Sequence, residues 1–184
     1  MIICISGFTA TGKDSTADYI AKKLNLPRVN YTFKDLAKDK DISLIEFQKM
    51  ASEDNGKIDK EFDKKLVKEA HRLNKEKGGC VVSTWISPWV LKDADFRIFI
   101  YAKEEEKAKR LIKRGDLKTI KEALEHIKKR EENNRKRYKK YYNIDIRDLS
   151  IFDIIIDNSD LKLEQTGEKI LKEIKKRNLT LKKN

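Results

Sequence analysis

A short loop near the start of the chain combines two glycines with a lysine. Gly7, Gly12 and Lys13 stand between the apolar run 2–6 and an amphipathic stretch that reaches residue 24. Glycines let the backbone curl around an anion with its N–H groups pointing inward, and a following helix directs its positive end to the same place. Lysine can reach the β- and γ-phosphates of a nucleotide. This spacing predicts a phosphate-binding loop; the alternative is a tight glycine-rich turn that binds nothing.

The residue after the lysine departs from the usual pattern of such loops. A serine or threonine hydroxyl normally stands there as a Mg²⁺ ligand, but this chain has Asp14, with Ser15 one place later. A carboxylate beside nucleotide phosphates would repel them unless a cation lies between. We therefore expect Asp14 and Ser15 to hold Mg²⁺, directly or through water.

The sequence offers few residues for histidine-based catalysis, zinc binding or acyl transfer. His71 and His126 are isolated on charged, helix-like stretches, and we expect both to be solvated. No Cys/His spacing indicates zinc, and no nucleophile-elbow motif indicates acyl transfer.

The elements that must position the loop alternate between strands and helices. Apolar runs predict strands over residues 2–6, 28–31, 80–84, 96–101 and 153–157. Helical patterns fill residues 32–78, 104–114, 119–141 and 167–176, with capping boxes at Ser43/Glu46 and Thr119/Glu122. Such alternation predicts an α/β fold, a doubly wound parallel sheet with its ligands at the carboxyl ends of the strands.

Two long helical insertions interrupt this alternation, one over residues 32–78 and one over residues 104–142. On a sheet with a phosphate loop, both insertions would rise beside that loop. A clamp on both sides suits transfer between two bound phosphorylated molecules better than simple hydrolysis.

Composition sets the broad class. The chain has 184 residues, enough for one domain with a substantial core, and a net charge of +12. Basic residues are concentrated between residues 103 and 140, a field that could bind nucleic acid, nucleotide phosphates or only solvent. Cys4 and Cys80 lie in apolar runs, without a cysteine framework. With no signal peptide and no apolar run long enough to span a bilayer, we expect a cytoplasmic protein that makes no membrane contact.

Several longer phrases resemble the archaeal-type cytidylate kinases, a branch of the P-loop nucleoside monophosphate (NMP) kinases. The most specific lies over residues 130–153, supported by residues 44–47, 58–63 and 89–95. The resemblance covers nearly the whole chain and implies a P-loop NTPase-type sheet of five parallel strands flanked by helices. It also implies Mg²⁺- and ATP-dependent phosphorylation of CMP or dCMP. Within a single domain, 1–184, the core would comprise residues 1–31, 79–103 and 143–184, the NMP-binding insertion 32–78 and the lid 104–142.

The resemblance assigns roles to individual residues. Catalytic roles are implied for Lys13, Arg114 and Arg130, since a phosphoryl group in transfer is stabilised by cationic groups and Mg²⁺ more than by acid–base chemistry. The residues implied for ATP binding are Gly7, Phe8, Thr9, Ala10, Thr11, Gly12, Lys13, Asp14, Ser15, Thr16 and Arg110. Those implied for binding the acceptor are Lys34, Asp63, Trp85 and Arg137.

The acceptor side departs from the family pattern. Lys34 stands where the family usually has arginine, and the family's Glu-Gly-Arg is replaced here so that Ser83 and Trp85 take the places of its Glu and Arg. Losing a bidentate contact to phosphate costs about 1.5–3 kcal/mol, so CMP would bind more weakly unless another group compensates. Trp85 could stack on the acceptor's base, or fill a gap beneath the insertion.

Two other functions stay open on the sequence alone. One is a P-loop kinase of a deoxynucleotide or another small phosphorylated metabolite. The other is a nucleotide-dependent RNA or ribosome-assembly factor that would contact nucleic acid through the basic helix over residues 128–140, helped by Tyr138, Tyr141 and Tyr142. Whatever its function, we expect the protein to be a monomer.

Overall fold

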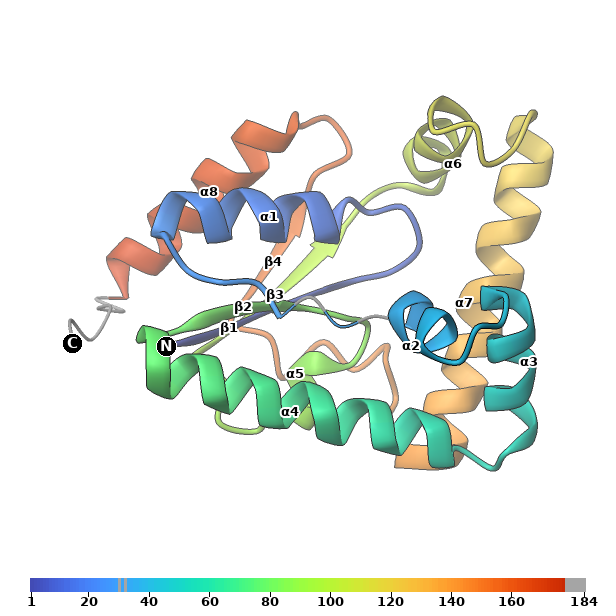
Figure 1. The fold of residues 1–184 in the computed structure, drawn as a ribbon. Coiled ribbons are helices and arrows are strands. Elements are labelled where there is room, and N and C mark those ends of the chain that lie inside the picture. Colours follow the sequence, from blue (N-terminus) through green and yellow to red (C-terminus); the bar gives the residue numbers. More distant parts are fainter. Residues whose placement is uncertain (30, 32, 178–184) are drawn as a thin grey trace.

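A four-stranded parallel sheet forms the centre of the protein (Figure 1). The computed structural model describes residues 1–29, 31 and 33–177. The strands are β1 (Ile2–Gly7), β2 (Cys80–Ser83), β3 (Phe96–Tyr101) and β4 (Ile154–Asp157), in the order β2-β1-β3-β4. All six residues of the central strand β1 are buried, as expected for a parallel sheet covered on both faces.

The prediction of five strands was wrong by one strand. Residues 28–31 were expected to form the fifth, but Arg28 makes only an isolated parallel bridge to Val81. Pro27 precedes it and has no amide hydrogen to donate to a longer ladder. Among the described residues the sheet therefore has four strands, with one bridge at its β2 edge.

Helices cover the two faces of this sheet. In Figure 1, α1 (Lys13–Leu24) and α8 (Leu163–Lys176) lie on one face, and α4 (Lys57–Lys77) and α5 (Ser87–Val90) lie on the other. Each side has its own apolar cluster, one formed with α1 and α8 and one with α4. The short helix α5 was not predicted, and α8 begins four residues before the predicted start at residue 167.

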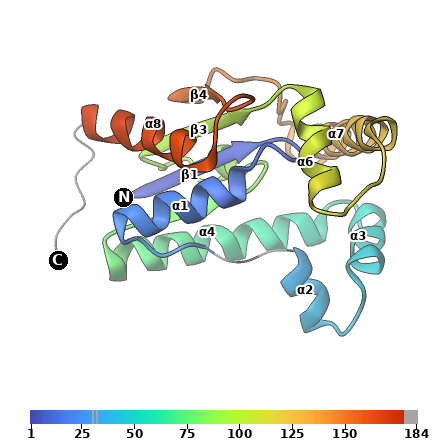
Figure 2. The same ribbon diagram turned by 90° about the horizontal axis from the view of Figure 1, so that it is seen from above.

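The remaining helices gather at the end of the sheet where β1 enters the glycine-rich loop (Figures 1 and 2). They are α2 (Phe33–Asp39) and α3 (Leu44–Glu53) from the first insertion, and α6 (Glu104–Lys113) and α7 (Ile120–Tyr142) from the second. Both predicted capping boxes are present, Ser43 with Glu46 at the start of α3 and Thr119 with Glu122 at the start of α7. Both insertions therefore stand beside the loop that the sequence singled out.

Candidate active site

The loop between β1 and α1 encloses a small pocket with a cavity volume of about 120 Å³. Residues 8–15 line it, together with Trp85 after β2, Arg114 after α6 and Arg130 from α7. The structure thus brings together the loop, two arginines of the second insertion and one aromatic residue that was predicted to bind the acceptor. These groups come from four separate parts of the chain.

Glycine is required at both ends of the loop. A Cβ added to Gly7 would stand 2.5 Å from Thr11 Oγ1 and 2.7 Å from the Ile100 carbonyl oxygen. Gly12 has φ +82°, in the left-handed region that favours glycine. It caps α1, so the free N–H groups of the first helical turn face the pocket. This arrangement can bind a chain of phosphate groups.

Arg110 and Asn158 hold the loop from the side of α6 and β4. Arg110 Nη1 donates to the Thr11 carbonyl at 3.1 Å and to Asn158 Oδ1 at 3.1 Å, while Asn158 Nδ2 donates to the same Thr11 carbonyl at 2.9 Å. Burial lowers the pKa of Arg110, and the carboxylates of Glu106 and Asp157 oppose that shift. The structure gives Arg110 loop carbonyls as partners, and its direct contact with ATP stays a prediction.

Asn158 was missed by the sequence analysis. It is buried, with 5% of its surface exposed, and it follows β4 directly. Polar residues at the carboxyl end of an apolar strand are a signal that could have pointed to it.

Lys13, Asp14 and Ser83 form a hydrogen-bonded chain at the mouth of the pocket. Lys13 Nζ lies 2.6 Å from Asp14 Oδ2, and Ser83 Oγ donates to Asp14 Oδ1 at 2.5 Å. Burial would raise the pKa of Asp14, but the charge of Lys13 and hydrogen bonds from Lys13 and Ser83 bring it below its usual value. Asp14 is thus ionised, and it lies beside the position where the sequence analysis noted a missing carboxylate.

The donor set at this mouth fits a magnesium ion bound together with phosphates. Mg²⁺ prefers oxygen ligands and is commonly held by one or two carboxylates plus substrate phosphates. Asp14 offers an ionised carboxylate and Ser15 an exposed hydroxyl. The described residues contain no cluster of three His, Cys, Asp or Glu that could hold a metal on its own, so phosphates and water would have to supply the remaining ligands.

Trp85 packs against the loop. Its ring stacks on Phe8 with centroids 5.4 Å apart, and Phe8 in turn meets Phe99 edge to face at 5.1 Å. The Trp85 carbonyl accepts a hydrogen bond from Ser6 Oγ at 2.7 Å. Trp85 therefore supports the loop and also lines the pocket, and its stacking on an acceptor base stays a prediction.

Asp63 and Arg137 lie together in a second cluster, between α4 and α7. Tyr142 Oη donates to Asp63 Oδ2, and Arg137 lies 3.7 Å from Asp59 and donates to Tyr138 Oη at 3.3 Å. Burial raises the pKa of Asp63 to about 6, although the hydrogen bond from Tyr142 acts in the opposite direction. Asp59 was not expected from the sequence, and Tyr142 was considered there only as an aid to nucleic-acid binding.

The other expected site residues have these positions. Arg114 pairs with Asp116 at 2.6 Å, whereas Lys34 lies in α2 and its side chain is outside the described part of the structure. His71 and His126 are exposed, as expected.

Nowhere in the described residues is there a helix long and apolar enough to cross a membrane.

Comparison with known proteins identifies the family. The model of the cytidylate kinase-like family matches residues 2–160. A cytidylate kinase of Pyrobaculum islandicum is 39% identical over 166 residues, covering 89% of this chain and 86% of that protein. Cytidylate kinase 2 of Borreliella afzelii is 36% identical over 181 residues, covering 97% and 99%.

Solved structures agree on the fold. An uncharacterized protein from Eubacterium ventriosum superposes with a TM-score of 0.68 at 20% identity, over 95% of this chain and 98% of that one. Shikimate kinase from Bacteroides thetaiotaomicron gives a TM-score of 0.57 at 16% identity, over 95% and 98%. The resemblance seen in the sequence and the P-loop kinase fold are both confirmed, and the chain belongs to the cytidylate kinase-like family.

Proposed function

We propose that this protein transfers the γ-phosphoryl group of ATP to a nucleoside monophosphate, with CMP or dCMP as the acceptor. Family membership supports the reaction, because curated relatives at 36–39% identity are cytidylate kinases. One structural observation carries the proposal. The pocket of the phosphate loop is completed by Arg114 and Arg130, two cations supplied by the second insertion.

The roles of the residues in catalysis follow from the negative charge of the phosphoryl group that is transferred. A phosphoryl group in transfer spreads negative charge over its oxygens, and preorganised cations stabilise that charge. Lys13 and the loop amides would bind the phosphates of ATP, while Arg114 and Arg130 would face the transferred group. Mg²⁺ would be held by Asp14 and Ser15 and would neutralise charge on the phosphates.

Binding of ATP requires Lys13 to change partners. Its ammonium group is paired with Asp14 at 2.6 Å, and only 16% of its side chain is exposed. A phosphate in the loop would take that ammonium group, and Asp14 would then be available to the cation. The pair therefore holds both side chains at the mouth of the pocket until the nucleotide arrives.

The acceptor needs no general base. Its phosphate has a second pKa near ~6 and is largely ionised at neutral pH. Lys34 would contribute a point charge to that phosphate, and Trp85 an aromatic face to the base. Asp63 and Arg137 would complete the acceptor side from the junction of α4 and α7.

A coupled assay of ADP release tests the proposal. We expect CMP and dCMP to give the highest kcat/KM in a panel that also contains UMP, AMP, GMP and dTMP, with no turnover when Mg²⁺ is chelated. Turnover of ATP that is equal with every monophosphate and without any of them would contradict it. Selective turnover of a different phosphorylated metabolite would reassign the acceptor.

The cysteines support a reducing, cytoplasmic setting for this enzyme, which we propose to be a monomer. Cys4 and Cys80 are both buried as free thiols. Burial raises the pKa of both, in Cys80 to about 12, so neither forms the reactive thiolate at neutral pH.

The contacts of α7 do not favour the nucleic-acid alternative. Glu132 pairs with Arg135 at 2.8 Å and with Lys136 at 3.7 Å, and Glu131 pairs with Lys107 at 2.7 Å. Part of the basic charge counted in the sequence is thus neutralised within the protein. A phosphate-backbone contact would show a steep loss of affinity with salt, which a nucleotide kinase need not show.

A further inference from the structure

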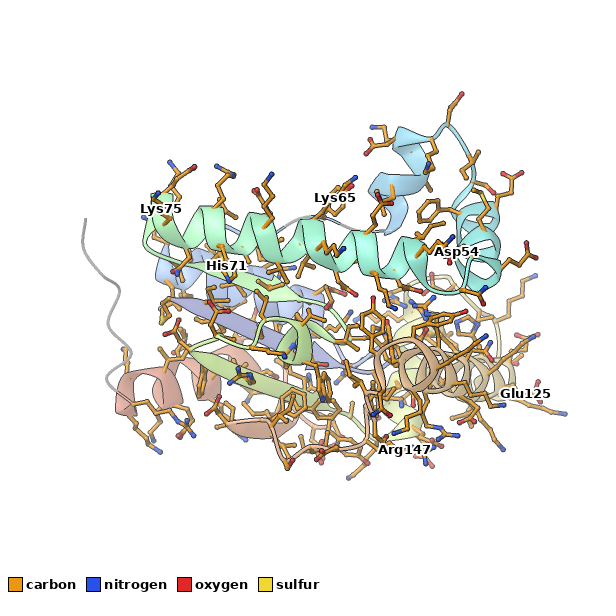
Figure 3. All side chains as sticks on the ribbon, turned by 90° about the horizontal axis from the view of Figure 1, so that it is seen from below. Asp54, Lys65, His71, Lys75, Glu125 and Arg147 are labelled. Atoms are coloured by element: carbon orange, nitrogen blue, oxygen red, sulfur yellow. The ribbon has the colours of Figure 1, made fainter. Side chains whose placement is uncertain are left out.

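A second hollow lies on the face of the sheet that carries α4 and α5, with a cavity volume of about 810 Å³. It is bordered by α4, α5 and the segment that follows α7, and it shares no lining residue with the phosphate-loop pocket. We call it the α4–α5 pocket. Figure 3 looks onto this face, with His71 on the edge of α4 turned toward the pocket and Lys65 on the other edge.

The floor of the α4–α5 pocket is apolar. It is formed by the partly buried side chains of Val67, Trp89, Val90 and Ile144. Trp89 meets Phe152 edge to face with ring centroids 5.3 Å apart, and this contact fixes its orientation. Small-molecule sites are typically concave, about 300–1,000 Å³ in volume and mainly apolar with a few polar groups, and this pocket has those properties.

The rim is cationic. Lys60, Lys64 and Lys68 recur every four residues along α4, and Lys92 follows α5; all four are exposed. None of them forms an ion pair within the part of the chain that the structure describes. Like charges four residues apart on a helix repel one another, so this row favours an anion at the rim.

The two acidic side chains near the pocket each have a hydrogen-bond partner other than a lysine. Asp63 accepts the hydrogen bond from Tyr142, and Asp93 pairs with His71 at 3.0 Å. The other flank of α4 shows the contrast, because Arg72 there is paired with both Glu69 and Glu76. Arg72 of one flank thus has two carboxylate partners, whereas in the described residues no carboxylate lies within ion-pair distance of the lysines at the rim of the pocket.

We propose that the α4–α5 pocket is a binding site for an organic anion with a flat, apolar body. The body covers Trp89 and its apolar neighbours, and the negative group lies between Lys64 and Lys68. This site is separate from the one that would bind ATP, and it adjoins the junction of α4 and α7 through Asp63 and Tyr142.

The two tryptophans of the chain allow each pocket to be observed separately. Trp85 lines the phosphate-loop pocket and Trp89 the α4–α5 pocket. Protein labelled with 5-fluorotryptophan should give two ¹⁹F resonances, assigned with Trp85→Phe. Titration with 8-anilinonaphthalene-1-sulfonate should shift the Trp89 resonance in a saturable way. The neutral analogue N-phenyl-1-naphthylamine should bind there about tenfold more weakly.

Matched variants test the role of the lysines. Lys64→Gln/Lys68→Gln should weaken the effect of the sulfonate on Trp89 by about tenfold. Lys169→Gln/Lys172→Gln removes the same charge from exposed positions of α8, across the sheet, and should leave the titration unchanged. The proposal is overturned if the Trp89 resonance does not move, if the neutral analogue binds equally well, or if both variants weaken binding alike. A shift of the Trp85 resonance by ATP reports the phosphate-loop pocket, so failure of one site is distinguishable from failure of the other.

Discussion

At the scale of single residues, Asp14 decides how the phosphate loop works. It takes the place of a neutral hydroxyl, and it is ionised between Lys13 and Ser83. A negative charge at this point is unfavourable next to phosphates unless a cation screens it. Asp14 therefore either helps to hold Mg²⁺ or weakens the binding of ATP through its negative charge. Its removal would weaken Mg²⁺ binding in the first case and raise the affinity for ATP in the second.

The variant Asp14→Ala separates the two cases, because alanine removes the carboxylate without supplying the hydroxyl that usually binds Mg²⁺ at this position. If Asp14 helps to hold the cation, the Mg²⁺ concentration needed for half-maximal activity should rise by about 10–100-fold, the usual effect of losing a group that supports a metal. The measurement is kcat as a function of free Mg²⁺ at saturating ATP. Asp18→Asn changes another carboxylate of the same helix and serves as the control.

Unchanged Mg²⁺ dependence in Asp14→Ala would show that Asp14 acts only as a negative charge at the start of α1. An increase in affinity for ATP would show that its charge opposes the nucleotide. Either result removes Asp14 from the proposed metal site.

At the scale of elements, the junction of α4 and α7 joins the two insertions. Asp63 is buried there, with 8% of its surface exposed, beside Tyr142, Asp59 and Arg137. Because its pKa is raised to about 6 in the folded protein, the folded state holds a proton more tightly than the unfolded chain. The stability from this group is fully present below the unfolded pKa and is lost as pH rises through about 6.

Asp63→Asn should therefore remove this contribution to the pH dependence of the free energy of unfolding. Between pH 4 and pH 7 the free energy of unfolding of the wild type should fall relative to that of the variant by on the order of 2–3 kcal/mol. Urea unfolding at each pH measures this difference. Tyr142→Phe removes the hydrogen bond that lowers the pKa of Asp63. The free energy of unfolding of this variant should therefore fall more steeply with pH than that of the wild type. If the free energies of unfolding of wild type and Asp63→Asn changed with pH in parallel, the raised pKa of Asp63 would be contradicted.

The contact of α1 with α8 depends on a glycine inside a helix. A Cβ on Gly167 would stand 2.2 Å from the ring of Tyr19. Alanine is favoured over glycine in a helix by about 1 kcal/mol, whereas overpacking costs about 1–3 kcal/mol. Because the ring must move, we expect Gly167→Ala to destabilise the protein.

Thermal unfolding of Gly167→Ala tests this balance, with Tyr19→Leu as the second background. The substitution should lower Tm in the wild type and raise it once the ring is gone, because only the helix preference then remains. A rise in Tm in both backgrounds would show that the Tyr19 ring moves aside at a cost smaller than the gain in helix preference.

At the scale of the whole molecule, the features found in the sequence are those with local signals. Gly7, Gly12 and Lys13 define the loop within seven residues, and the two capping boxes define helix starts within four. The features that were missed join distant parts of the chain. Asn158 and Thr11 lie 147 positions apart, and Asp63 and Tyr142 lie 79 apart.

Only the packed fold brings such pairs together, and no single-sequence pattern indicates them. The strand count failed for a related reason. Residues 28–31 have the composition of a strand, but whether a strand forms depends on how many residues pair with β2, and only Arg28 does so among the described ones.

The arrangement of both insertions beside one loop makes a prediction for the entire protein. If the two nucleotides bind there together, a compound that joins adenosine and cytidine through five phosphates should occupy both positions and hold the insertions in place. A ligand that binds only the folded state raises its stability in proportion to the logarithm of its affinity. We expect this compound to raise Tm more than ATP and CMP added together at the same concentration, and the Arg130→Ala variant to lose most of the difference. An equal shift with ATP alone would mean that only one nucleotide is held, and the two insertions would then have to serve some purpose other than transfer between two bound phosphates.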